Sequence, residues 1–364
     1  MLTEARRLQM LRIPTGKVDM VLDTDTYNEV DDQFALAFLI RSAEQVSLRA
    51  VYAAPFHAQP FFPAPLIRWR SESPEDGMER SYEEILHIIA LCGGDFPGQV
   101  KKGSRRFLPD RHTPVTSPAA LDLAERAMRY SPERPLYVAA IAAVTNIASA
   151  LLLNPEIADR MVVCALIGNA REALATDEFN LMQDVAAVQV LFDSGVPLVQ
   201  LPCEGVVDRF AITVPELRAH LVGRGPLCTY LLDAATELIE WCSPEGGGSH
   251  PIWDVCAAAW PMNQGERFMT GCLVPTPGIT ADRRYIPRRD ALCGADPAGG
   301  AVRPPFYCAG RHLNRAGQTY QRGRKGIWTS RSQSDSSILP FNTTPRRSPP
   351  CMTSISKSAS MKRS

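Results

Sequence analysis

The chain has 364 residues, of which 45% are hydrophobic and 21% charged, and its 39 basic residues balance its 39 acidic ones. That length suits one large α/β domain or two smaller domains. The ten cysteines include no C-x-x-C pair, so neither a zinc site nor a disulfide framework is indicated.

The charges are distributed unevenly along the chain. Twelve of the Lys and Arg residues lie in residues 301–364, together with a single acid, Asp335. The preceding part is therefore acidic, which argues against a nucleic-acid-binding core, because neutralising phosphates takes clustered positive charge. Residues 1–12 lack the apolar region of a signal peptide, and no stretch approaches the ~18 apolar residues of a membrane helix. We expect a cytoplasmic protein with no membrane contact.

Residues 17–282 alternate between short β-rich runs and helix-length segments, which predicts an α/β domain. Its mostly parallel central sheet would be open, Rossmann-like and flanked by helices. Strands are expected at residues 18–22, 48–53, 136–140, 161–167 and 196–201. Helices are expected at residues 32–41, 81–92, 119–130, 142–153, 184–194, 215–221, 226–241 and 254–262.

Three segments fall outside this alternation. Residues 1–16 read as an N-terminal extension, and residues 55–80 as a Pro-rich loop with a functional role. Residues 283–364 are rich in Pro, Arg and Ser, so we expect a basic tail that is disordered or derives from a shifted reading frame.

The most informative segment follows the first expected strand. It contains Asp23, Asp25, Glu29, Asp31 and Asp32, with no Lys or Arg among them. Carboxylates this close raise one another's pKa, and a hard divalent cation with oxygen ligands relieves their repulsion. A helix cap or turn explains one or two such residues, but not five. We therefore expect a metal or catalytic site at the carboxyl end of a strand, where α/β sheets bind ligands.

Three further polar sites come later in the chain. Asn169 follows an apolar run, Glu178 and Asn180 lie in a polar cluster, and Asp254 opens an apolar helix. Each has a structural alternative, such as a turn or an N-cap. Together with the acidic turn they indicate binding of a cation and of hydroxyl groups, since Glu and Asn offer the acceptors and donors that a vicinal diol requires.

The acidic turn, residues 141–148, the triplet Glu178-Phe179-Asn180 and the pair Trp253-Asp254 occur in the order found in nucleoside hydrolases. From about residue 18 to about residue 282, the chain resembles this inosine/uridine-preferring N-ribohydrolase superfamily. The resemblance implies Ca²⁺-dependent hydrolysis of small ribonucleosides to ribose and free base, in purine or pyrimidine salvage. It also implies a homo-oligomer, either a dimer or a tetramer.

The resemblance further implies roles for single residues. Asp25 matches the metal-bound carboxylate that takes a proton from the attacking water, at an oxocarbenium-like ribosyl centre. Glu178 and Asn180, with Asn169, resemble the residues that hold the ribose hydroxyls, and Trp253 would stack on the base. The calcium ligands would be Asp25, Asp31, Asp32, Asp254 and the main-chain carbonyl of Ile141.

Three features depart from the family's pattern. Five residues separate Asp25 from Asp31, where familiar members have three. Trp253 stands where many purine-active members have a histidine that protonates the departing base. An indole cannot protonate the base at neutral pH. We therefore expect that the proton comes from another group, or that substrates with better leaving groups are preferred. We expect His57 and His250 to be surface or loop residues. Beyond residue 282 the family's closing segment is missing, so deleting residues 290–364 should leave folding and calcium binding intact.

Two other functions fit the same residues. The run Asp23-Thr24-Asp25-Thr26 resembles the nucleophile loop of haloacid-dehalogenase-type phosphatases, which use Mg²⁺ and need a later lysine. A catalytically decayed nucleoside- or ribose-binding relative would also keep these residues.

Overall fold

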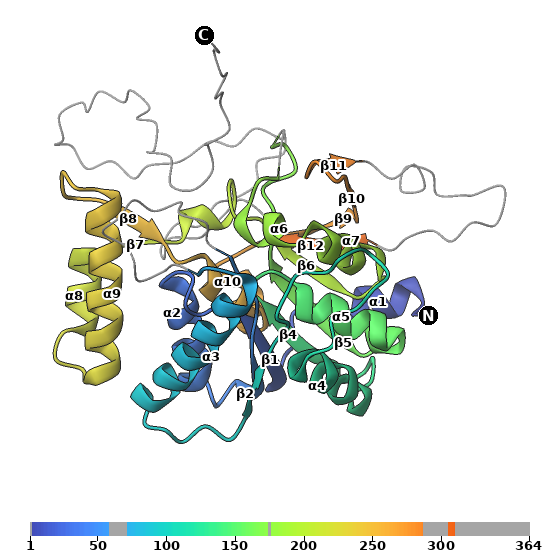
Figure 1. Cartoon of the computed structure of the whole chain (residues 1–364), viewed down its shortest axis with the longest axis horizontal. Coiled ribbons are helices and arrows are strands. Elements are labelled where there is room, and N and C mark those ends of the chain that lie inside the picture. The colour runs from blue at the N-terminus through green and yellow to red at the C-terminus, as the bar shows by residue number, and fades with distance from the viewer. Residues whose placement is uncertain (1, 58–70, 174–175, 287–304, 310–364) are drawn as a thin grey trace, which may run out of the picture.

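The computed structural model describes residues 2–57, 71–173, 176–286 and 305–309. Its centre is an eight-stranded sheet of order β3-β2-β1-β4-β5-β6-β12-β9 (Figure 1). The strands from β3 to β12 in this order pair in parallel, and β9 is antiparallel to β12. The expected mostly parallel α/β fold is confirmed. The strands are β1 Val18–Thr24, β2 Val46–Ala53, β3 Gln99–Lys102, β4 Leu136–Ala140, β5 Met161–Leu166, β6 Leu198–Leu201, β9 Gly271–Pro275 and β12 Pro305–Ala309.

Helices cover both faces of this sheet, because successive strand side chains point to opposite sides. In β1, Met20 and Leu22 join one buried cluster and Val21 joins the other. The first cluster is shared with α1 Glu4–Met10, α2 Asp31–Arg41, α3 Pro74–Leu91 and α10 Trp253–Ala259. The second is shared with α4 Pro118–Arg126, α5 Thr145–Leu153 and α7 Val185–Asp193. Figure 1 shows α2 and α3 on one side of the strands and α4, α5 and α7 on the other.

A helical pair, α8 Val214–Leu221 and α9 Pro226–Cys242, stands beside the sheet with a small core of its own (Figure 1). Two short antiparallel strands, β7 Ala211–Thr213 and β8 Ser249–Pro251, precede and follow the pair. Tyr230 on α9 donates to Glu84 on α3 at 2.5 Å, which ties the pair to the main body. The remaining elements are α6 Phe179–Gln183, β10 Gly278–Ile279, β11 Tyr285–Ile286 and 3₁₀ turns at Ala127–Arg129, Pro155–Asp159, Val207–Arg209, Trp260–Met262 and Gln264–Glu266.

The expected loop over residues 55–80 is wrong in its last seven residues, because α3 already begins at Pro74. Proline is well suited to the first turn of a helix, where its missing N–H has no intrahelical role. The hydroxyl of Ser73 caps this turn by accepting from the Asp76 N–H at 3.1 Å. Gly77 then packs against Phe56, where an added Cβ would lie 2.1 Å from a backbone oxygen. Residues 58–70 lie outside the described residues.

Two segments of the expected tail, residues 283–364, form strands. Tyr285–Ile286 forms β11 and Pro305–Ala309 forms β12, which lies between β6 and β9. The physical reason is that β6 would otherwise present an unpaired edge, which an apolar strand can cover. The proposed deletion of residues 290–364 would remove β12, so it tests whether the sheet folds without the strand that lies between β6 and β9. The other residues of 287–364 lie outside the described residues.

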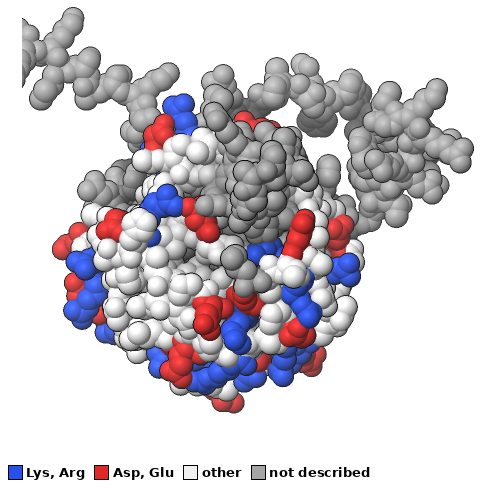
Figure 2. Space-filling model, turned by 90° about the vertical axis from the view of Figure 1, so that its right-hand side faces the viewer, with Lys and Arg blue, Asp and Glu red and all other residues white. Residues whose placement is uncertain are grey.

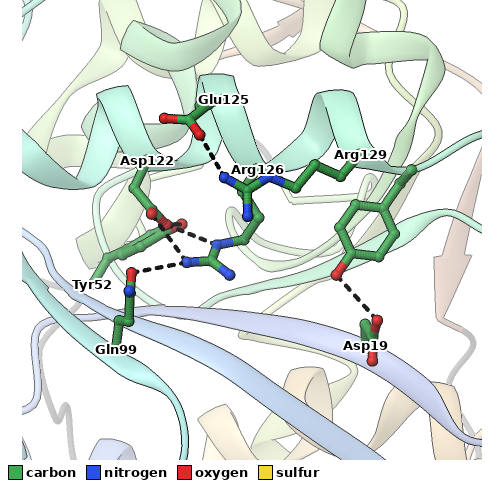
Figure 3. A network of polar contacts seen from close by, with 8 residues as sticks. Asp19, Tyr52, Gln99, Asp122, Glu125, Arg126 and Arg129 are labelled. Carbon is green, nitrogen blue, oxygen red and sulfur yellow. Dashed lines mark hydrogen bonds and ion pairs between the residues drawn. The ribbon is translucent and has the colours of Figure 1, made fainter.

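Polar contacts fasten α4 to the edge of the sheet (Figure 3). Arg126 holds both carboxylate oxygens of Asp122, at 2.8 and 3.0 Å, and reaches Gln99 of β3 at 3.2 Å. Tyr52 of β2 donates to the same Asp122 at 2.5 Å. Because a bidentate Arg–carboxylate pair is geometrically specific, this network fixes the register of α4 against β2 and β3.

The face shown in Figure 2 carries basic and acidic side chains intermingled along its lower half. No helix within the described residues is long and apolar enough to cross a membrane.

Candidate active site

The acidic turn lies where the strand order of the sheet reverses. β1 is flanked by β2 on one side and by β4 on the other, and chain order runs outward from β1 in both directions. In open α/β sheets, ligands bind outside the carboxyl ends of the strands at such a point. The backbone oxygen of Asp23 accepts from the N–H of Ile141 at 2.9 Å, which aligns the ends of β1 and β4. The loop after β1 and the start of α2 therefore border one crevice.

Three aspartates from opposite ends of the domain meet there. Carboxylate oxygens of Asp31, Asp32 and Asp254 lie within 4.8 Å of one another, and all three residues are buried. The Asp254 N–H donates to Asp31 Oδ2 at 3.3 Å across 223 positions of sequence. This contact follows from the packing of α10 against α2.

Asp25 completes the group from the loop after β1. It is 1% exposed, and neither of its carboxylate oxygens has a hydrogen-bond partner within the described residues. Buried polar groups in native proteins are almost always paired. This oxygen pair, beside three other buried carboxylates, offers the all-oxygen donor set that a hard divalent cation prefers.

The electrostatics of the cluster support that interpretation. Burial first, and then the charges of Asp32 and Asp31, raise the pKa of Asp25 well above its usual range. Burial likewise raises the pKa of Asp31 and of Asp254, each with help from neighbouring carboxylates. Burial raises the pKa of Asp32 to about 7, although Thr24 Oγ1 donates to it at 2.5 Å. Four such groups must share protons or be neutralised by a bound cation.

Behind this cluster lies a buried polar pair that the sequence analysis did not single out. Asn146 on α5 donates from Nδ2 to Asp23 Oδ1 at 2.8 Å. Its Oδ1 accepts from the N–H and the hydroxyl of Ser104, at 2.8 and 3.0 Å. Burial raises the pKa of Asp23 to about 7, while the bond from Asn146 lowers it. Asn146 thus holds the carboxyl end of β1 against α5.

Replacing Asn146 by leucine should cost about 3 kcal/mol of stability, because it leaves Asp23 and the Ser104 N–H buried without partners. Urea unfolding measures the loss. The half-buried Asn154, whose side chain caps the turn that begins at Pro155, supplies the control: Asn154→Ala should cost only about 1 kcal/mol. Equal losses in the two variants would contradict a special role for Asn146.

The residues expected to hold ribose form a second part of the cavity wall, at the start of α6. Glu178 caps α6 by accepting from the N–H groups of Gly168, Asn180 and Leu181 at 2.8, 2.8 and 3.0 Å. Burial raises its pKa to about 7. Asn180 donates to the carbonyl of Leu166 at 3.1 Å, so its amide is held in one orientation.

Asn169 lies behind that wall. Its Oδ1 accepts from the Glu204 N–H at 3.1 Å, and its carbonyl accepts from the Tyr285 hydroxyl at 3.0 Å. It is 4% exposed and is not among the described residues that line the cavity. Its contacts support the loop after β6.

A third wall carries aromatic rings. Trp253, at the start of α10, contacts His250 in an edge-on arrangement with ring centroids 5.1 Å apart. His250 Nε2 lies 2.5 Å from Glu29, which comes from the lengthened loop after β1. The expectation that His250 is a surface or loop residue is wrong, since it is 3% exposed and lies in β8. The pairing of β7 with β8 places His250 beside Glu29 of the acidic loop, although the two residues are 221 positions apart in the sequence.

These walls enclose one cavity of about 1000 Å³. Every residue named as a possible metal ligand lines it, as do Glu178, Asn180 and Trp253. His57 is not among its described lining residues; its N–H donates to Gln183 Oε1 at 2.8 Å. The lining also includes residues without an assigned role in the sequence analysis: Asn28, Cys203, Glu204, Asp208 and Trp241.

A family model for the inosine-uridine preferring nucleoside hydrolases matches residues 73–304. The chain belongs to this family. It is therefore a glycosidase of the N-ribohydrolase class, as the resemblance implied. The match extends beyond residue 282, where the resemblance in the sequence ended, and β9, β10 and β11 all lie within it.

Individual relatives are distant. A pyrimidine-specific ribonucleoside hydrolase, RihA, from Citrobacter koseri is 25% identical over 217 residues, which cover 53% of this chain and 69% of RihA. A purine-preferring ribonucleoside hydrolase from Gardnerella vaginalis superposes with a TM-score of 0.62 at 20% identity, covering 81% of this chain and 94% of the other. The plant nucleoside hydrolase PpNRh1 gives a TM-score of 0.61 at 15% identity, covering 82% and 95%. Similarity at this level shows the shared fold.

Proposed function

We propose that the chain hydrolyses the N-glycosidic bond of ribonucleosides, with Ca²⁺ as cofactor, and releases ribose and free base. The observation that carries the proposal is the meeting of Asp25, with both oxygens unpartnered among the described residues, and the trio Asp31, Asp32 and Asp254. This arrangement lies at the point of the sheet where ligands bind. Its cavity has hydrogen-bonding groups on one wall and an indole on another.

The side chains present fit a calcium ion. Asp25, Asp31, Asp32 and Asp254 would hold it, with the main-chain carbonyl of Ile141, which also lines the cavity. All of these offer oxygen, and Ca²⁺ takes 6–8 oxygen ligands in flexible geometry. When bound, the ion would lower the pKa of a water molecule and help to orient the sugar hydroxyls.

The protein's own groups would then divide the reaction among them. Asp25, a buried carboxylate at the cluster, accepts the proton of the attacking water. The water oxygen bonds to C1′ of the ribose as the bond from C1′ to the base nitrogen breaks. Glu178 and Asn180 are fixed acceptors for the ribose hydroxyls and stabilise the positive charge that develops on the sugar without reorganising.

Trp253 would form the platform for the base. Replacing it by alanine should raise KM by roughly tenfold, as loss of stacking on a base does. The shape of the pH–rate profile should stay unchanged, because an indole does not titrate at neutral pH. Trp253→Phe should restore most of the affinity. Loss of the acidic limb in Trp253→Ala, or in His250→Ala, would instead identify that residue as the source of the leaving-group proton.

Hydrolysis of p-nitrophenyl riboside, measured beside p-nitrophenyl phosphate with and without EGTA, tests the proposal. We expect release of p-nitrophenol from the riboside alone, abolished by EGTA and restored by excess Ca²⁺. Turnover of the phosphate would favour the dehalogenase-type phosphatase, although none of the described residues lining the cavity is a lysine. Ribose binding without turnover of either compound would favour a decayed, binding-only relative.

A further inference from the structure

We propose that this cavity selects nucleosides whose base carries a fixed positive charge at the glycosidic nitrogen, as N-ribosylpyridinium compounds do. This inference rests on the proposed function, since it concerns the substrate class of the same site. It is carried by the acidic residues of the cavity wall, by unpartnered buried oxygens of two residues that line the cavity, and by the aromatic platform.

The wall of the cavity is strongly acidic. No lysine or arginine is found among the described residues that line it. Eight acidic side chains line it, which is more than a single divalent cation can neutralise when they are ionised. The acidic lining residues are Asp25, Glu29, Asp31, Asp32, Glu178, Glu204, Asp208 and Asp254.

This negative charge extends beyond the metal cluster. Glu204 and Asp208 follow β6, on a loop far in sequence from every proposed metal ligand. The thiol of Cys203 in the same wall responds to the charge. Burial first, and then Glu178 and Glu204, raise its pKa. A cation anywhere in this region is attracted by several carboxylates at once.

Two oxygens outside the metal cluster lack partners in the described part of the chain. Asn28 is 7% exposed, lines the cavity, and its Oδ1 accepts no hydrogen bond there. Oδ1 of Asp208 is likewise buried without a partner, although its backbone N–H is fixed by Cys203 at 3.0 Å. Buried acceptors are satisfied by ordered water, an ion or a ligand when the protein does not satisfy them. Their chemistry suits a donor-bearing or cationic group.

The aromatic platform points to the same substrate class. Trp253 is held edge-on by His250, which is itself tied to Glu29 at 2.5 Å. Tryptophan is the side chain that attracts cations most strongly through its ring face. A flat cationic base stacked on this indole, inside an acidic wall, gains from both interactions.

The chemistry removes the need for an acid at Trp253. When the C1′–N bond of a cationic nucleoside breaks, its electron pair passes to the ring nitrogen and neutralises the base. The water oxygen bonds to C1′, and the proton of the water goes to Asp25 and then to solvent. The products are ribose, a neutral base and one proton, so no proton has to be delivered to the leaving group.

The affinities of three matched compounds test the proposal. Each compound is added as a competitive inhibitor of p-nitrophenyl riboside hydrolysis with Ca²⁺ present, and its inhibition constant is measured. They are N-ribosylnicotinamide, its uncharged dihydro form and its 5′-phosphate. We expect the cation to bind roughly tenfold more tightly than the dihydro form, and the phosphate roughly tenfold more weakly than the cation. Equal affinity for the charged and uncharged forms would overturn the proposal.

Two isosteric substitutions tie the preference to the wall. Asp208→Asn and Glu204→Gln should each reduce the cation-to-neutral affinity ratio by roughly three- to tenfold. Glu125→Gln, on α4, removes one charge from the surface ion pair that Glu125 makes with Arg129 (Figure 3) and should leave the ratio unchanged. A ratio that neither cavity substitution alters would also overturn the proposal.

Failure of the proposed function gives a different result. If p-nitrophenyl riboside is not hydrolysed, the hydrolase proposal fails, and calorimetry then measures the same three affinities directly. A preference for the cation in calorimetry would still support the substrate class. Hydrolysis without that preference would leave the hydrolase proposal standing and refute this one.

Discussion

Asp25→Asn should lower kcat for p-nitrophenyl riboside by roughly 10³- to 10⁴-fold, because it removes both a proton acceptor and a cation ligand. The same substitution should leave the melting temperature of the metal-free protein unchanged or raise it. In the wild type, the carboxylate is buried with no hydrogen-bond partner for either oxygen among the described residues. An uncharged amide in its place relieves repulsion from Asp32 and Asp31.

Activity, calcium affinity and thermal melting, measured on the same preparation, check this result. Asp233→Asn, on an exposed position of α9 outside the cavity lining, makes the same chemical change and should alter none of the three. A variant at position 25 that keeps wild-type turnover would remove the basis for the assigned role of Asp25. Loss of activity accompanied by a large fall in melting temperature would instead mean that Asp25 is structural.

The second large effect is a stability that falls with rising pH when calcium is absent. Burial raises the pKa of Asp23 from 3.8 to about 7, and Asp32 and Glu178 also reach about 7. Between about pH 4 and pH 7, these groups bind more protons in the folded chain than in the unfolded chain. The free energy of unfolding therefore decreases as the pH rises through this range. The contribution of these three groups to the free energy of unfolding is fully present below pH 4. It is lost progressively as the pH rises to about 7.

For Asp23 alone, a rise of about three pKa units corresponds to about 4 kcal/mol. In a domain of this size, that would lower the melting temperature by roughly 10 °C between pH 4 and pH 8. Melting curves in EGTA across this range measure the fall. Added Ca²⁺ should cancel much of it above pH 7, since it binds only the folded, ionised cluster. A melting temperature that rises with pH in EGTA would show that these carboxyls are not buried as described.

Strong local patterns predicted the centre of the fold well. The strands around Val18, Leu136 and Met161 are apolar, bounded by polar residues and buried on both faces, so their sequence shows them clearly. The edge strand Gln99–Lys102 was missed because its composition, Gln-Val-Lys-Lys, resembles a solvent-exposed loop. Residues 74–80 were missed as helix because Pro74 was interpreted as a breaker, whereas it occupies the first helical turn.

The acidic cluster was visible in the sequence, but its partners on the aromatic wall were not. Asp25, Asp31 and Asp32 lie within one short turn, and Asp254 was grouped with them as a further polar site, whereas its role as a metal ligand came from the family resemblance. The pairing of Glu29 with His250 spans 221 positions and depends on the β7–β8 pairing. No local sequence periodicity predicts such a contact, because it forms only when the loop after β1 packs against β8 in the folded chain. Its only trace in the sequence was the extra length of the loop after β1.

The meeting of Asp31 and Asp254 has a consequence for how the domain holds together. A metal ion held by both would act as a removable crosslink, closing a loop of 223 positions. Closing a loop of that length in the unfolded chain costs about 5 kcal/mol by the estimate used for covalent crosslinks. A chelator would open this link within an intact polypeptide, so resistance to proteolysis should track free calcium.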